Sequence, residues 1–276
     1  MLKSINQWSF AADTPLDKLL SVCNDAGYAA VELNLNPQGE IGFTMDTTAA
    51  EAEAIGKLAA SHGLQLRSLS TGLLWGAPLS SADDSVREQG RRIVTKQLEL
   101  SELLGIDTVL VVPGAVNKET SYDQCYERSQ RELRRLAGEA EKRGVRIGVE
   151  NVWNKFLLSP LEMARYIDEC ESNYVGAYFD VGNILQFGFP EQWIRILGAR
   201  ILKVHVKDFK TDVGNITGFV SLLNGDVDWH EVRKALQEIG YADTLTAELA
   251  IFKSDPLQMV YDTSRHLDVI LGGNAR

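Results

Sequence analysis

The sequence has few of the residues that would build a covalent or zinc-bound framework. Its 276 residues include three cysteines, Cys23, Cys125 and Cys170, which are widely spaced and form no CxxC pair. An odd number of scattered cysteines argues against a disulfide scaffold and against a zinc ribbon. The sequence therefore predicts free thiols in a reducing compartment.

Long apolar runs and an excess of positive charge are also missing. No apolar run approaches the roughly 20 residues that a membrane-spanning helix needs. The N-terminal MLKSINQWSFAAD lacks the apolar core of a signal peptide. The formal net charge is −10, and an acidic chain repels the phosphates of nucleic acids. We therefore expect a cytoplasmic protein without a membrane or nucleic-acid partner.

The chain does contain a regular alternation of short apolar segments and longer amphipathic ones. Glycine follows several of the amphipathic segments, as is common at the C-terminal ends of helices. The expected strands are 3–9, 29–35, 64–70, 107–113, 146–151, 175–183, 200–208 and 244–250. The expected helices are 13–26, 47–61, 80–104, 121–142, 159–170, 190–197, 228–239 and 255–271.

This alternation predicts an α/β protein with a closed parallel sheet, the (β/α)8 TIM barrel. The rival open sheet usually has a glycine-rich turn after its first strand, whereas here that strand leads into SFAADT. No low-complexity linker interrupts the pattern, so we expect one domain, residues 1–276. The longest irregular stretch, Phe209 to Val227, is expected to be an active-site loop.

Four titratable residues lie in or at the end of otherwise apolar expected strands. Glu150 ends RIGVE, Asp180 ends VGAYFD, His205 lies in KVHV and Glu248 ends TLTAE. A buried carboxylate is costly unless a cation or hydrogen-bond donors compensate it. Each residue alone could be structural, but four at corresponding ends of successive barrel strands predict one shared metal site. One imidazole and three carboxylates suit a single divalent ion, namely Mn²⁺, Mg²⁺, Co²⁺ or Zn²⁺.

Polar and aromatic residues near other strand ends are candidates for substrate binding. Glu32 lies in the second expected strand and could bond a ligand or orient a neighbouring side chain. Asn6 could contact a sugar hydroxyl and Trp75 could stack on a sugar face. The structural alternatives are a turn cap for Asn6 and an exposed aromatic ring for Trp75.

Two lysines follow the expected histidine ligand. Lys207 and Lys210 could each hold a substrate phosphate or hydroxyl group. Lys207 could instead pair with its neighbour Asp208 or with groups on adjacent strands. The sequence leaves these alternatives open.

At these residues the chain resembles the xylose isomerase-like TIM-barrel superfamily of sugar isomerases and epimerases. The resemblance covers nearly the whole chain and includes a DxGN and an HVKD motif, which are similar to the branch of sugar-phosphate 3-epimerases that act on L-xylulose 5-phosphate. It is carried by VEN (149–151), FDVGN (179–183), VHVKDFK (204–210), NGDVDW (224–229) and TAEL (246–249). The resemblance implies that Glu150, Asp180, His205 and Glu248 bind the metal, and that the two glutamates also transfer protons. It further implies homodimers or homotetramers.

One position departs from the pattern of the epimerases that act on free ketoses. Those enzymes commonly have a substrate-contacting histidine three residues after the aspartate of the sixth strand, whereas this chain has Asn183 there. The difference favours the DxGN branch and makes Asn183 a further candidate for substrate binding.

We therefore expect an isomerase that acts on a small sugar or sugar phosphate through a cis-enediolate at a ketose carbon. Glu150 and Glu248 would form the acid–base pair, since carboxyl groups on the two faces of a planar intermediate invert the carbon. The alternative is a dehydratase of the dehydroshikimate or inosose type on the same site. Four histidines and the acidic charge argue against an abasic-site endonuclease, and the complete ligand set argues against an inactive scaffold.

Overall fold

A closed parallel sheet surrounded by helices forms the molecule, here described for residues 1–273 from a computed structural model. The strands follow the order β1, β11, β8, β7, β6, β5, β4, β2, and β1 also pairs with β2, which closes the barrel. These strands are β1 (Leu2–Asn6), β2 (Ala30–Asn36), β4 (Gln65–Thr71), β5 (Thr108–Val111), β6 (Arg146–Glu150), β7 (Val175–Asp180), β8 (Ile201–Val206) and β11 (Thr244–Ala247). The predicted (β/α)8 barrel is confirmed.

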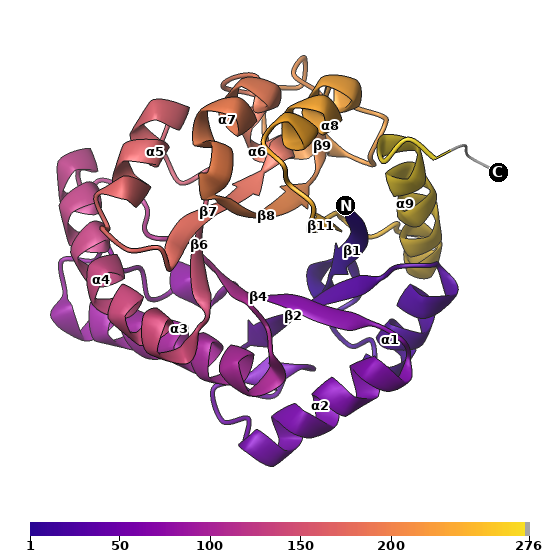
Figure 1. Cartoon of the computed structure of the whole chain (residues 1–276), viewed down its shortest axis with the longest axis horizontal. Coiled ribbons are helices and arrows are strands. Elements are labelled where there is room, and N and C mark those ends of the chain that lie inside the picture. The colour runs from indigo at the N-terminus through magenta and orange to yellow at the C-terminus, as the bar shows by residue number, and fades with distance from the viewer. Residues whose placement is uncertain (274–276) are drawn as a thin grey trace.

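Helices cover the outside of the barrel, as the view along its axis shows (Figure 1). They bury apolar faces against the strands, and the resulting core includes fully buried Leu20, Leu98 and Ile194. The helices are α1 (Leu16–Asp25), α2 (Ala49–Ser61), α3 (Asp84–Leu104), α4 (Tyr122–Arg143), α5 (Pro160–Asp168), α6 (Val181–Ile184), α7 (Pro190–Leu197), α8 (Trp229–Glu238) and α9 (Pro256–Ile270). None of these helices combines the length and the apolar character that crossing a membrane requires.

Three helices begin at least two residues later than expected, and capping residues account for two of them. The third, α1, begins at Leu16 rather than at residue 13. In α2, Thr48 and Glu51 form a capping box, so the helix begins at Ala49 rather than at residue 47. In α3, the Asp83 side chain accepts a hydrogen bond from the Ser85 amide, and the helix begins at Asp84 rather than at residue 80.

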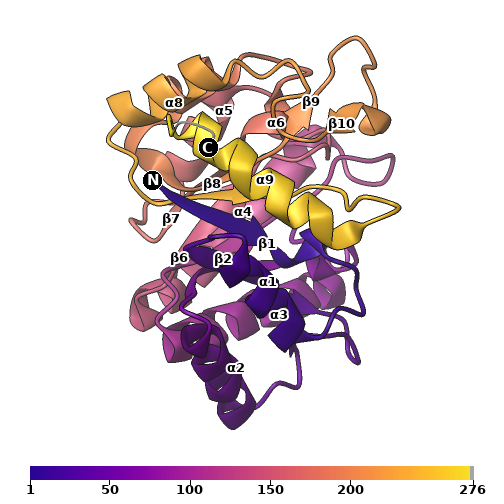
Figure 2. The ribbon, with the colours of Figure 1, turned by 90° about the vertical axis from the view of Figure 1, so that its right-hand side faces the viewer.

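The loops at the carboxyl ends of the strands lie on one side of the barrel (Figure 2). There β3 (Phe43–Thr44) extends the sheet beside β2, and β9 (Asp208–Phe209) pairs antiparallel with β10 (Phe219–Val220). Short 3-10 turns complete this side at Gln7–Ser9, Leu73–Trp75 and Ile216–Gly218, whereas a fourth, Gly198–Arg200, leads into β8. The expected irregular stretch 209–227 thus contains a small hairpin and a 3-10 turn.

Candidate metal centre and active site

The four candidate ligands meet at the carboxyl ends of neighbouring strands. Glu150 and Asp180 are the last residues of β6 and β7, His205 lies near the end of β8, and Glu248 directly follows β11. Asp180 and His205 are partners in the register of β7 and β8. One ligand atom from each of the four residues can be chosen so that all four lie within 4.8 Å of one another. The convergence predicted from the strand ends is therefore observed.

The chemistry of this cluster fits a divalent cation. It offers one imidazole nitrogen and three carboxylates, a mixed set that suits Mn²⁺, Mg²⁺, Co²⁺ or Zn²⁺. Asp180 Oδ2 is buried and accepts no hydrogen bond within residues 1–273. Lys207 Nζ lies 3.2 Å from this oxygen, close enough for charge attraction but outside hydrogen-bond geometry. A buried carboxylate oxygen that accepts no hydrogen bond is free to coordinate a cation, which would compensate the cost of its burial.

A network below the cluster fixes the orientation of the His205 ring. Nδ1 faces the other candidate ligands, 3.2 Å from Glu150 Oε1 and 3.1 Å from Glu248 Oε2. Nε2 lies 2.6 Å from Glu32 Oε1 and donates its proton there, because an ionised carboxylate can only accept. Orientation of a histidine ligand by a carboxylate behind it is common in metal sites.

Glu32 is itself held by several donors, and it has no solvent exposure. It accepts hydrogen bonds from Asn6 Nδ2 at 2.6 Å, from Ser68 Oγ at 2.5 Å and from the Tyr178 hydroxyl. Burial alone would raise the pKa of Glu32, but His205 and these donors lower it to about 2. Glu32 is therefore an ionised hydrogen-bond acceptor that orients the His205 ring.

Burial and neighbouring charges move the pKa values of the two glutamates in opposite directions. Burial raises the pKa of Glu150 to about 7. Burial would also raise the pKa of Glu248, but the Lys207 ammonium and His205 lower it to about 2. Two carboxyl groups whose environments separate their pKa values are typical of an acid and a base in one site.

Lys207 is part of the cluster rather than a partner of Asp208. Its Nζ lies 3.0 Å from Glu248 Oε1, and 5.9 Å from the centre of the Phe219 ring. Asp208 instead accepts hydrogen bonds from the Phe209 and Val227 amides and from Trp229 Nε1. The alternative pairing between Lys207 and Asp208 is therefore wrong.

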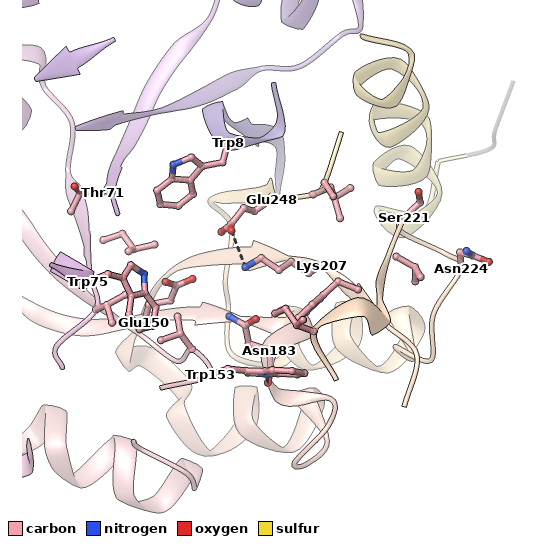
Figure 3. A pocket seen from close by; sticks show the side chains of 18 of the residues that line it. Trp8, Thr71, Trp75, Glu150, Trp153, Asn183, Lys207, Ser221, Asn224 and Glu248 are labelled. Atoms are coloured by element: carbon pink, nitrogen blue, oxygen red, sulfur yellow. Dashed lines mark hydrogen bonds and ion pairs between the residues drawn. The ribbon is translucent and has the colours of Figure 1, made fainter. Parts of the chain in front are cut away.

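A cavity of about 820 Å³ opens above the cluster. Glu150, Glu248 and Lys207 form its polar floor, and Figure 3 shows Glu248 facing Lys207. Trp8, Trp75 and Trp153 supply much of the remaining wall. The cavity thus combines an acidic floor, whose residues suit a divalent cation, with broad aromatic sides.

Comparison with known proteins agrees with this geometry. Residues 20–268 match the family model described as xylose isomerase-like TIM barrel. The chain belongs to this family.

The named relatives of this xylose isomerase-like barrel are sugar-phosphate epimerases. SgbU of Escherichia coli K12 is 24% identical over 96% of this chain and 94% of its own, and its name gives L-ribulose-5-phosphate 3-epimerase activity only provisionally. UlaE of Salmonella heidelberg, named L-ribulose-5-phosphate 3-epimerase, is 24% identical over 84% of this chain and 81% of its own. These relatives confirm the predicted epimerase branch and agree with the predicted isomerase class.

Solved structures of similar fold include an L-ribulose 3-epimerase. It superposes with a TM-score of 0.81 at 20% identity, covering 98% of this chain and 94% of its own. At this identity the similarity shows the fold that the two barrels share.

The remaining predicted substrate-binding residues of this xylose isomerase-like barrel lie in different places. Asn183, Lys207 and Trp75 line the cavity, and Trp75 is 54% exposed. Asn6 and Glu32 are fully buried below it and belong to the His205 network. Lys210 is not among the lining residues.

Several cavity residues were not predicted from the sequence. Trp8 and Trp153 each follow a strand end by two or three residues, so proximity to a strand exit was an available signal. Ser221 and Asn224 come from the loop between β10 and α8. Their position depends on how that long loop folds back, which spacing along the chain does not show.

Proposed function

We propose that this protein is a divalent-metal-dependent 3-epimerase of a ketose or ketose phosphate. The observation that carries the proposal is the metal-binding cluster, which presents Glu150 and Glu248 together at the floor of one cavity. The names of the relatives support epimerisation over the dehydratase alternative. We further propose that residues 1–276 form one domain.

Glu150, Asp180, His205 and Glu248 are the proposed ligands of one Mn²⁺, Mg²⁺, Co²⁺ or Zn²⁺ ion. When bound, such an ion supplies positive charge beside the carbonyl and adjacent hydroxyl oxygens of a ketose and so makes the neighbouring C–H more acidic. Glu32 holds His205 for this role through the 2.6 Å contact.

The two glutamates transfer the proton in the proposed reaction. One carboxylate removes the proton from the carbon next to the carbonyl, and that carbon becomes planar. The other carboxyl group returns a proton to the opposite face, which inverts the carbon. For this exchange one glutamate has to accept a proton while the other donates one, as in other acid–base pairs. Lys207 and Asn183, on the cavity wall, are proposed to hold substrate hydroxyl groups.

Deuterium exchange tests the proposal. In D₂O with Mn²⁺, the enzyme should place deuterium at C3 of L-ribulose or its 5-phosphate without loss of water. Glu150→Gln and Glu248→Gln should each lower this exchange by roughly 10²–10⁴-fold, the usual contribution of a general acid or base. Glu53→Gln, at an exposed position of α2, serves as the control. Near-normal exchange by either active-site variant would refute the assignment, and release of water would indicate a dehydratase.

A further inference from the structure

The charges around the cavity bear on whether the substrate carries a phosphate. Among the residues that line it, Lys207 is the sole cationic side chain. Its Nζ is already engaged by Glu248 at 3.0 Å and by Asp180 at 3.2 Å. Proteins usually bind phosphate esters through unengaged arginine or lysine side chains, helix N-termini or loop amides.

The places where barrels usually bind phosphate present no cationic side chain to this cavity besides Lys207. These are the loops after the last two strands and the helix N-terminus beside them. After β11, Ala250 and Phe252 face the cavity, and the Gln258 amide at the start of α9 already donates to Asp255 Oδ1 at 3.2 Å. After β8, the lining residues Ser221 and Asn224 are uncharged.

Nearby lysines do not change this balance. Lys210 and Lys253 lie in the same two loops, but neither is among the lining residues. The acidic side chains Glu150 and Glu248 line the cavity as proposed cation ligands, so they offer no hydrogen-bond donor to a phosphate there.

The walls are suited to a neutral sugar. Trp8 and Trp75 line the cavity and are 38% and 54% exposed, so their ring faces are accessible from it. Trp153 is held in place, because its Nε1 donates to the Asn183 carbonyl at 2.8 Å and its ring packs 5.3 Å from that of Phe209. Flat aromatic surfaces beside a few polar groups bind the C–H faces of a sugar while the polar groups take its hydroxyls.

We propose that the substrate is an uncharged, unphosphorylated keto sugar held against Trp8 and Trp75. This inference rests on the proposed epimerase function and narrows its substrate class. It separates the chain from its named relatives, whose names specify a phosphorylated sugar.

Calorimetric titration of the Mn²⁺-loaded protein tests this inference with unreactive probes, L-arabitol and L-arabitol 5-phosphate. We expect the neutral polyol to bind at least about tenfold more tightly, a difference of about 1.4 kcal/mol. Equal or tighter binding of the phosphate ester would overturn the inference, and so would the absence of binding by both probes.

Substitution of a wall residue tests the aromatic part. Trp75→Ala should weaken L-arabitol binding by about fivefold to tenfold, because it removes an exposed stacking surface. Leu161→Ala, at a 70% exposed position of α5 outside the cavity, should leave binding unchanged. Equal affinities of the Trp75 variant and the wild type would overturn the assigned role of this wall.

Failure of the inference and failure of the proposed function give different results. If L-arabitol binds preferentially but no ketose exchanges its C3 proton, the epimerase function fails and the neutral site stands. If L-ribulose 5-phosphate exchanges its C3 proton at least as efficiently as L-ribulose, the function stands and the inference fails.

Discussion

Glu32 shows how a residue outside the cavity can control the chemistry within it. Its carboxylate lies 2.6 Å from His205 Nε2, so the other ring nitrogen, Nδ1, faces the other candidate metal ligands. A neutral histidine ligand needs its second nitrogen protonated, and the Glu32 carboxylate stabilises that tautomer. In the proposed reaction Glu32 therefore acts only through His205.

Replacing Glu32 by glutamine should therefore weaken metal binding. Glu32→Gln keeps the shape of the side chain but places an NH₂ group where it can face the donors Asn6 Nδ2 and His205 Nε2. We therefore expect the affinity for Mn²⁺ to fall by roughly 10–100-fold. Equilibrium dialysis of Mn²⁺ measures the effect. Ser68→Ala is the matched control, because it removes one donor to Glu32 without touching His205, and its effect should be smaller. A Glu32 variant with wild-type Mn²⁺ affinity would contradict this role.

Residue type and strand position were enough to predict the cluster of four candidate metal ligands. The acids and the histidine stand out because they interrupt apolar strands whose ends must meet in a closed barrel. The contact between Glu32 and the His205 ring was not predictable, because it depends on which side chains of distant strands meet below the cavity. Side-chain direction and the packing of Ser68 and Tyr178 decide it.

Among the elements, the loop between β8 and α8 depends most on one buried side chain. Asp208 has no solvent exposure and accepts the Phe209 and Val227 amides, so it joins the two ends of the loop. It also accepts Trp229 Nε1 at the start of α8. A Cβ on Gly225 would lie 2.2 Å from Asp208 Oδ1, so the chain can approach this carboxylate only with glycine there.

Asp208→Asn should loosen the loop. The asparagine side chain has one oxygen in place of two, so it cannot accept from both the loop amides and Trp229 Nε1. One buried donor is then unpaired, at a cost of about 1–3 kcal/mol. We expect faster cleavage by trypsin at Lys210, detected by mass spectrometry of native protein under limiting protease. The control is Asp212→Asn, at an exposed position of the same loop. Identical cleavage rates for wild type and the Asp208 variant would contradict the anchoring role.

Periodicity predicted the barrel elements well because each helix must bury one face against the sheet. It misplaced the starts of α1, α2 and α3, and in the last two the capping contacts of Thr48 and Asp83 set the boundary. It also missed the β9–β10 hairpin, whose strands of two residues are too short to show alternation.

Across the whole molecule, a charged network closes the barrel at the end opposite the cavity. Lys203 in β8 is fully buried, and its Nζ lies 2.7 Å from Asp243 Oδ2 and 3.0 Å from Asp107 Oδ1. Arg67 in β4 lies 2.9 Å from Asp243 Oδ2. The network links strands from both halves of the chain across the base of the barrel.

Asp243→Asn should destabilise the protein in a pH-dependent way. Burial opposes ionisation, but Arg67 and Lys203 lower the pKa of Asp243 below its ordinary value. Its stabilising effect is therefore present above the pKa of an unfolded aspartate, about 3.9, and is lost as pH falls through the lower folded value. We expect a loss of about 1–3 kcal/mol at neutral pH, because the buried Lys203 charge loses one partner.

Urea denaturation measures this effect at about pH 7, pH 5 and pH 3.5. The difference from wild type should persist between the first two values and shrink at the last. Asp46→Asn, at an exposed position, should show little difference at any pH. A loss that grows with falling pH would contradict the assigned sign.

Glu150, Asp180, His205 and Glu248 are proposed to share one divalent cation. Equilibrium dialysis with Mn²⁺, comparing wild type with His205→Ala, tests this shared site. We expect one Mn²⁺ per chain in the wild type and an affinity at least about 100-fold weaker in the variant. Binding of no ion by the wild type, or the same affinity and stoichiometry in His205→Ala, would contradict it.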